Sequence, residues 1–161
     1  MKLSLLTACT ILAAATISST ASAQDPRKTA DVLTGNAKGT AANNPVCKLF
    51  TPAEAAKYVG EPVGAPENAA LGSGCQWAAK DDDGDMLVQV VAASYHEEPT
   101  QAKGFQRVAE LGPRAFVVPE LGGWKAATVR GQESLIVSVS GPGASQQTAV
   151  ALLKELLSRR K

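Results

Sequence analysis

Two cysteines, Cys47 and Cys75, constrain the fold of this chain more than any other feature of its sequence. The chain has three cysteines, and the third, Cys9, lies in an N-terminal leader that we expect to be removed. An even pair left in an oxidising compartment is expected to form a disulfide. Closing a loop of about 29 residues restricts the unfolded chain by an entropy equivalent to roughly 3–4 kcal/mol. The bridge should therefore hold Cys47 against a strand that starts at Cys75; the alternative is two free, buried thiols.

Residues 1–23 have the three regions of a secretory signal peptide. Lys2 gives a basic start, an apolar run covers residues 3–17, and Ala21-Ser22-Ala23 is a small-residue cleavage site. The run is short for a membrane-spanning helix, so we expect no transmembrane segment in the mature chain. We therefore predict a periplasmic or secreted protein.

The leader also permits a rival interpretation. Leu6-Thr7-Ala8-Cys9 resembles a bacterial lipoprotein box, in which Cys9 would be lipidated and become the new first residue. Only eight residues precede Cys9, which leaves almost no apolar core for export. We favour cleavage after Ala23 for that reason.

Charge excludes two classes of partner. Removing the leader takes away one basic residue and no acid, so 15 basic residues face 15 acidic ones and the formal charge is zero. Nucleic acid and anionic lipid both need a concentrated positive surface, so neither is expected as a partner. The only basic run, Arg159-Arg160-Lys161, is predicted to complement the dipole at a helix C-terminus.

Composition divides the mature chain in two. Residues 24–45 have no apolar periodicity and end in Asn43-Asn44-Pro45, so we predict a disordered tether that cannot offset its ordering entropy. Residues 46–161 are long enough for one hydrophobic core, and we predict a single domain there.

The elements of this domain predict an α+β fold. Thr51, Pro52 and Glu54 form a helix start and Gly60 a helix stop. Apolar spacing predicts two further helices, over 100–111 and 145–159. Alternating or β-branched runs predict five strands, over 75–79, 86–92, 115–118, 124–130 and 134–140. Tight turns between neighbouring strands require antiparallel pairing, so the prediction is an antiparallel sheet of about five strands in the order α-β-β-α-β-β-β-α, with helices mainly on one face.

The acidic run from Asp81 to Asp85 has two interpretations. Asp83-Gly84 between two strand-like segments is typical of a hairpin turn. Asp81, Asp83 and Asp85 also alternate like calcium ligands. However, a calcium-binding loop needs a glycine and then a bidentate glutamate at fixed positions, and here those positions are occupied by Met86 and Ala92. We therefore expect a solvated turn and no metal site.

Several short motifs carry a resemblance to a known group of proteins. They are Cys47-Lys48-Leu49, Thr51-Pro52-Ala53-Glu54-Ala55, Val59-Gly60, Cys75-Gln76-Trp77, Leu111-Gly112-Pro113-Arg114-Ala115 and Arg130-Gly131-Gln132. With the final helix, this pattern resembles small exported bacterial envelope proteins, best known as actinobacterial lipoproteins of unknown function. The chain departs from them at the lipobox and at Pro113, where an acidic residue commonly follows the glycine. The resemblance implies an exported domain and assigns no catalytic residue.

No catalytic set can be assembled from the sequence. His96 is the only histidine and stands in a polar segment after a strand, so we expect an exposed loop residue without a zinc-binding or triad partner. We therefore predict no cofactor, no metal and no catalytic residue. The favoured function is a non-catalytic binding or interaction module of the cell envelope, whose partner is another envelope or secreted protein or a small ligand. The alternative is a carboxylate-based enzyme, or an enzyme accessory or inhibitor, in the same compartment.

Trp124 is the one candidate contact residue. It follows Gly122-Gly123 at the start of a predicted strand, where an aromatic side chain can anchor a protein partner. Because the domain has few aromatic residues, the competing interpretation places both Trp77 and Trp124 in the core.

Overall fold

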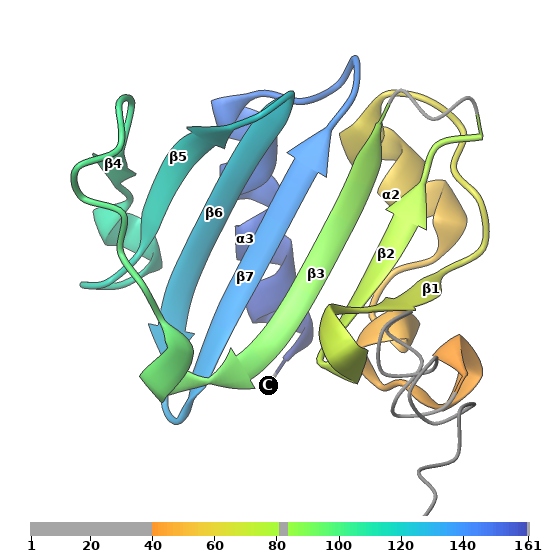
Figure 1. The fold of residues 1–161 in the computed structure, drawn as a ribbon, viewed down its shortest axis with the longest axis horizontal. Coiled ribbons are helices and arrows are strands. Elements are labelled where there is room, and N and C mark those ends of the chain that lie inside the picture. Colours follow the sequence, from red (N-terminus) through yellow and green to blue (C-terminus); the bar gives the residue numbers. More distant parts are fainter. Residues whose placement is uncertain (1–39, 81–83, 161) are drawn as a thin grey trace, which may run out of the picture.

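A computed structural model describes residues 40–80 and 84–160 of the chain. It forms a seven-stranded sheet with two α-helices, α2 (Pro52–Val59) and α3 (Gln146–Arg159) (Figure 1). The strands are β1 (Glu67–Ala69), β2 (Gly74–Ala78), β3 (Asp85–Ala92), β4 (Gln106–Arg107), β5 (Phe116–Glu120), β6 (Gly123–Arg130) and β7 (Glu133–Ser140). The predicted leader, Cys9, most of the predicted tether, and Asp81 and Asp83 lie outside the described residues.

The sheet is antiparallel throughout, in the order β1-β2-β3-β7-β6-β5-β4. The α+β class is confirmed, and each of the five predicted strands is present within one or two residues of its predicted bounds. The count of five was wrong, because β1 and β4 add one short strand at each edge. Each covers an edge that would otherwise expose unpaired backbone groups.

Local signals account for α2. The side chain of Thr51 accepts from the backbone N–H of Glu54, and Glu54 accepts in return from the backbone N–H of Thr51. Gly60 ends the helix with φ of 89°. A side chain at Gly60 would meet the backbone of Gly143, so a glycine is required both for the left-handed turn and for the close approach.

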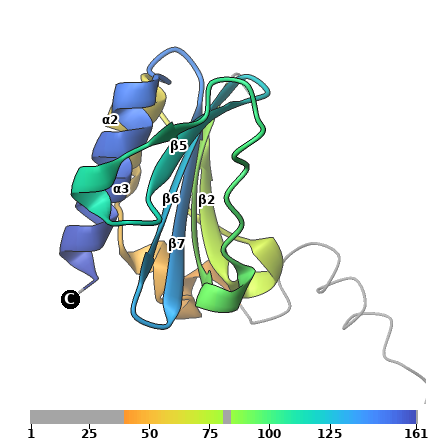
Figure 2. The same ribbon diagram turned by 90° about the vertical axis from the view of Figure 1, so that its left-hand side faces the viewer.

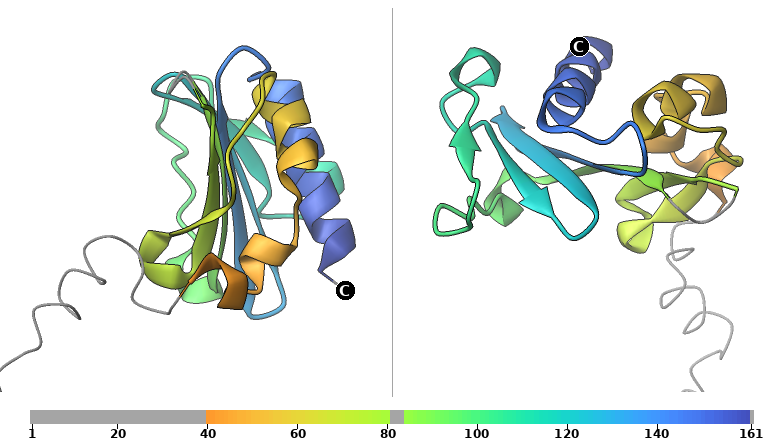
Figure 3. Two further views of the ribbon diagram at one scale, coloured as in Figure 1. Left: turned by 90° about the vertical axis from the view of Figure 1, so that its right-hand side faces the viewer. Right: turned by 90° about the horizontal axis from the view of Figure 1, so that it is seen from above.

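Both α-helices lie on the same face of the sheet (Figures 2 and 3). Alternate strand residues point towards them and form the main core with the apolar side of α3. The largest fully buried members of this core are Trp77, Met86, Leu135, Leu152, Leu153 and Leu156. None of the helices in residues 40–80 and 84–160 is long and apolar enough to cross a membrane.

The predicted disulfide joins the N-terminal segment to this core. Cys47 lies in the 3₁₀ turn η2 (Val46–Lys48), and its sulfur is 2.08 Å from that of Cys75 in β2. Both cysteines are buried. The turn that leads into α2 is therefore fixed to the sheet.

Residues 40–45, which the prediction assigned to the tether, are described by the structure and pack against the domain. The 3₁₀ turn η1 (Ala41–Asn43) precedes Asn44, which is buried. The side-chain amide of Asn44 donates to Asn68 Oδ1 at 2.9 Å and to Gly74 O at 2.8 Å. These contacts come from residues far along the chain, so composition alone could not reveal them.

The predicted helix over residues 100–111 was wrong. That segment contains turns, β4 and the 3₁₀ turn η5 (Ala109–Leu111), and Gly104 has φ of 83°. Val108 is buried in the main core, whereas Phe105 packs with Phe116 in a second cluster on the opposite face of the sheet. A helix would put residues three apart on one side, but here the chain wraps around the sheet edge.

Candidate functional site

An open groove lies on the face of the sheet away from the α-helices, at the end of β3. Its walls are two 3₁₀ turns, η3 (Ala70–Gly72) and η4 (Ala93–Tyr95), which flank the arrowhead of β3 in Figure 1. The groove has a volume of about 670 Å³, and its lining is apolar or aromatic except for Ser73 and Glu133. The lining residues are Ala70, Leu71, Ser73, Val90, Val91, Ala92, Tyr95 and Glu133.

Leu71 forms one wall in an unusual backbone conformation. Ala70 and Leu71 have φ of 49° and 54°, and Gly72 follows with φ of 81°. The left-handed region costs an L-amino acid about 1–2 kcal/mol, so two adjacent non-glycine residues there store strain. Ser73 holds the turn by donating from its N–H and its hydroxyl to Ala70 O. The leucine side chain is 57% exposed.

Tyr95 forms the opposite wall and is 73% exposed. It is the last residue of η4, whose first N–H, that of Ala93, donates to Gln132 O at 2.8 Å. The N–H of His96 donates back to Ala93 O and ends the turn. Two large apolar side chains thus face solvent across one groove, although burial of both would be favourable.

His96 was expected to be an exposed loop residue, and that prediction was wrong. The residue is only 7% exposed. Its Nδ1 is 2.8 Å from Ser134 Oγ, its Nε2 is 3.1 Å from Arg114 O, and its ring packs at 5.6 Å from that of Phe116. The residue is buried because the segment after β3 folds back over β7 and β5.

The contact between His96 and Ser134 does not form a usable hydrolytic device. Ser134 is completely buried, so its hydroxyl cannot reach a substrate. Glu98 lies 3.9 Å from Nε2 of His96, but that nitrogen is occupied by the Arg114 carbonyl, and Glu98 is held by Arg107 at 2.5 Å and Arg114 at 2.7 Å. This cluster therefore fixes the segment in place and does not meet the geometry of a catalytic triad.

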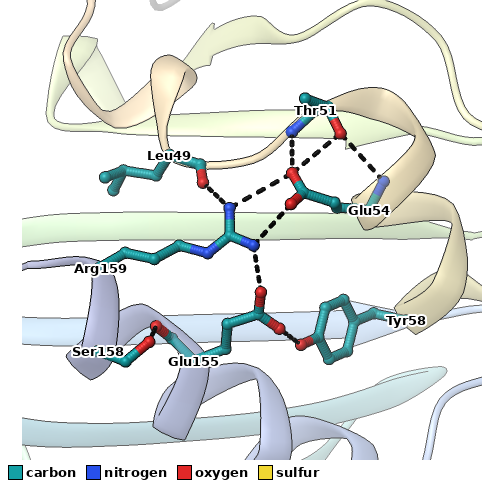
Figure 4. Close-up of polar contacts among 7 residues, drawn as sticks. All are labelled: Leu49, Thr51, Glu54, Tyr58, Glu155, Ser158 and Arg159. Atoms are coloured by element: carbon teal, nitrogen blue, oxygen red, sulfur yellow. Dashed lines mark hydrogen bonds and ion pairs between the residues drawn. The ribbon is translucent and has the colours of Figure 1, made fainter.

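A second polar cluster joins the two α-helices. Figure 4 shows Arg159 of α3 reaching the start of α2, where it donates to Glu54 at 2.7 Å and to the carbonyl of Leu49. It also pairs with Glu155, which accepts from the hydroxyl of Tyr58. The guanidinium carbon of Arg159 lies 4.3 Å from the centre of the Phe50 ring, a favourable cation–π contact.

The two carboxylates of this cluster, Glu54 and Glu155, both contact Arg159. Hydrogen bonds from Arg159 and Thr51 lower the pKa of Glu54 to about 2. The Tyr58 hydroxyl and Arg159 also lower the pKa of Glu155. A general acid needs a raised pKa, so both shifts run against a carboxylate-based reaction at this place.

Arg159 of the predicted basic run lies in the last turn of α3, where its charge complements the helix dipole, while Lys161 lies outside the described residues. Arg159 turns back to α2, and Arg160 pairs with Glu133 at 2.5 Å. Arg130 from the β6–β7 hairpin also donates to the carbonyls of Leu157 and Arg160. A different element thus adds a further favourable charge at this helix end.

The remaining candidate residues take ordinary positions. Trp77 is completely buried, and Trp124 is partly buried against the main core. Asp85 accepts from Gln76 at 2.8 Å and from Ser140 at 2.5 Å. Within the part of the chain that the structure describes, no group of three or more His, Cys, Asp or Glu side chains could hold a metal ion. The role of Trp124 as a partner contact stays a prediction.

Comparisons with known proteins provide no relative. No protein-family model matches the chain, and no curated protein and no solved structure matches it either. The resemblance to exported actinobacterial lipoproteins therefore stays a prediction. The groove was not anticipated from the sequence, and the only local signal for it is a lone leucine, Leu71, within a loop of small residues.

Proposed function

We propose that this protein is a non-catalytic binding module of the cell envelope that docks a protein partner in the groove between Leu71 and Tyr95. The observation that carries the proposal is the strained turn that holds Leu71 out of the core. Strained backbone persists only where surrounding contacts enforce it, and such sites concentrate at ligand clamps. Here the strain presents an apolar side chain to solvent at the rim of a groove.

The lining of the groove supports a protein partner over a polar small ligand. Polar side-chain groups in the lining are those of Ser73 and Glu133 and the hydroxyl of Tyr95, and Glu133 is already paired with Arg160. An apolar or aromatic side chain from a partner could be buried between Leu71 and Tyr95. Such anchors in partly desolvated pockets provide most of the energy of many protein interfaces.

Two observations favour binding over the carboxylate-based alternative. Glu54 and Glu155 converge on Arg159, and their lowered pKa values keep them ionised. The groove itself contains one acid, Glu133, so it does not hold a carboxylate pair.

The disulfide between Cys47 and Cys75 supports the exported location, because such bridges persist in oxidising compartments.

Photo-crosslinking can test the proposal in the cells that produce the protein. Benzoylphenylalanine would replace Leu71 or Tyr95 in two variants, and Leu121 in a matched control. Leu121 is fully exposed in the β5–β6 turn, at the opposite end of β6 from the groove. We expect one protein to be captured from positions 71 and 95 and not from position 121.

Identification of the captured protein is followed by a binding measurement with the purified pair. Leu71→Ser should weaken the interaction at least about tenfold, since burial of one large apolar side chain is worth roughly 1.5–3 kcal/mol. Leu121→Ser should leave it unchanged. Equal binding by wild type and Leu71→Ser, or equal capture from all three positions, would contradict docking in the groove.

A further inference from the structure

The wall of the groove formed by Tyr95 depends on His96. The 3₁₀ turn η4 spans three residues, and a single turn has no stability of its own. It is held at its start by the bond from Ala93 N–H to Gln132 O and at its end by the buried His96 ring. The backbone carbonyl of His96 also accepts from the Arg114 side chain at 3.1 Å. Release of the ring would leave the end of η4 held by this contact with a half-exposed arginine.

The hydrogen bonds define the protonation state of the ring. Nε2 of His96 faces the carbonyl oxygen of Arg114 at 3.1 Å, which can only accept, so Nε2 carries a hydrogen. In the neutral ring Nδ1 then accepts from the hydroxyl of Ser134 at 2.8 Å. The neutral form with hydrogen on Nε2 therefore satisfies both partners.

A second proton on Nδ1 would disturb this arrangement. Ser134 would have to accept from the ring, and its own hydrogen would lose its acceptor in a site with no exposure to solvent. The charged groups that face the ring are Glu98 from its own segment, Arg107 from β4 and Arg114 before β5. Glu98 favours a charged ring, but it already binds both arginines.

These surroundings lower the pKa of His96 below its usual value of 6.5, chiefly through burial. The charges of Arg114 and Arg107 act in the same direction, while the Arg114 carbonyl and Glu98 oppose them. We call the arrangement with the ring held between Ser134 and Arg114 closed, and the one with the ring released open. The open state binds a proton more readily, so the closed state is most stable above pH 6.5 and loses stability as the pH falls from 6.5 to the lowered pKa.

We propose that His96 is a pH-sensitive pin: while neutral it holds η4 and the Tyr95 wall of the groove, and on protonation it releases them. The inference rests on the proposed function for what the groove binds, but the movement of η4 requires no partner. Acidification would thus weaken partner binding by removing one wall of the groove. The other wall, Leu71 in η3, is held by the bonds from Ser73 to Ala70 O and should not respond.

Nuclear magnetic resonance of the full chain without a partner can test the pin. The His96 ring resonances and the backbone amides of residues 93–98 would be followed from pH 8 to 4.5, together with hydrogen exchange corrected for intrinsic rates. We expect hydrogen on Nε2 at pH 8 and a common midpoint below 6.5 for the ring and the amides. The open population should rise by at most tenfold per pH unit, because one proton is bound.

Two variants separate His96 from other titrating groups. His96→Gln cannot be protonated and should abolish the transition at residues 93–98. Glu98→Gln should keep the transition and move its midpoint to lower pH, because a carboxylate that favours the charged ring is lost. Leu71 and Gly72 amides serve as an internal reference that should not shift.

Clear outcomes would overturn the pin. Three results in the wild type would each overturn the proposal. They are a His96 titration midpoint at or above pH 6.5, a hydrogen on Nδ1 at pH 8, and titration of the ring without any change at residues 93–98. Persistence of the transition in His96→Gln would do so as well. Failure of the crosslinking experiment would contradict the proposed partner and leave these measurements unaffected, so the two proposals can fail separately.

Discussion

Removal of the Cys47–Cys75 disulfide should cost this domain a large part of its stability. The two cysteines are 28 residues apart in the sequence. In the chain-entropy description, a closed loop of that length restricts the unfolded chain by about 3.6 kcal/mol at 25 °C. Since small domains unfold with about 5–15 kcal/mol, the loss would be a quarter or more of the total.

Alanine is the appropriate replacement at both positions. Cys75 is completely buried, and a serine hydroxyl there without a partner would cost a further 1–3 kcal/mol, approximately. Cys47→Ala, Cys75→Ala and the double variant all remove the same bridge. We therefore expect all three to be destabilised by similar amounts, and reduction of the wild type to have the same effect.

Urea and thermal unfolding followed by circular dichroism would measure these differences. For a domain of this size the melting temperature should fall by roughly 10–18 °C. Reductant should leave the double variant unchanged, which serves as the control. Unequal losses in the single variants that add in the double variant would show independently buried thiols and refute the reasoning.

Three further predictions concern strain, burial and charge. Leu71→Gly should raise the free energy of unfolding by about 1 kcal/mol, because glycine tolerates the left-handed turn. A lower free energy of unfolding in urea titrations of the variant would contradict backbone strain at Leu71. Trp77→Ala should cost roughly 3–5 kcal/mol and clearly more than Trp124→Ala, since only Trp77 is completely buried; equal thermal shifts would argue against that difference. Arg159→Gln should return the pKa of Glu54 from about 2 towards 4.5. The wild type loses the stabilisation from ionised Glu54 as pH falls from 4.5 to 2, so the variant should be less stable than the wild type at pH 7 and approach it near pH 2. Parallel curves of the free energy of unfolding against pH would show that the ion pair between Arg159 and Glu54 does not contribute to stability.

Elements with local signals could be predicted from the sequence. Thr51, Glu54 and Gly60 lie within ten residues of one another and define α2 through hydrogen bonds between near neighbours. The alternation along β7 is equally local, because successive side chains of a strand point to opposite faces. The pairing of Cys47 with Cys75 needed only the count of cysteines and the expected compartment.

The segment around His96 shows what local signals could not decide. Its ring is fixed by Ser134 and Arg114, which are 38 and 18 residues away in the chain. The spacing of Phe105 and Val108 is that of a helix, yet the two side chains pack in clusters on opposite faces of the sheet. Burial against different surfaces outweighed helix propensity, which is a weak preference.

The sequence by itself determined the α+β class, the two α-helices, the five longer strands and the cysteine pair, because short-range hydrogen bonding and periodicity specify them. Only the tertiary structure decided the groove. Leu71 and Tyr95 are 24 residues apart and belong to two turns that meet at the end of β3 because β2, β3 and β7 pair side by side. A site built from residues that strand pairing brings together cannot be read from either segment alone.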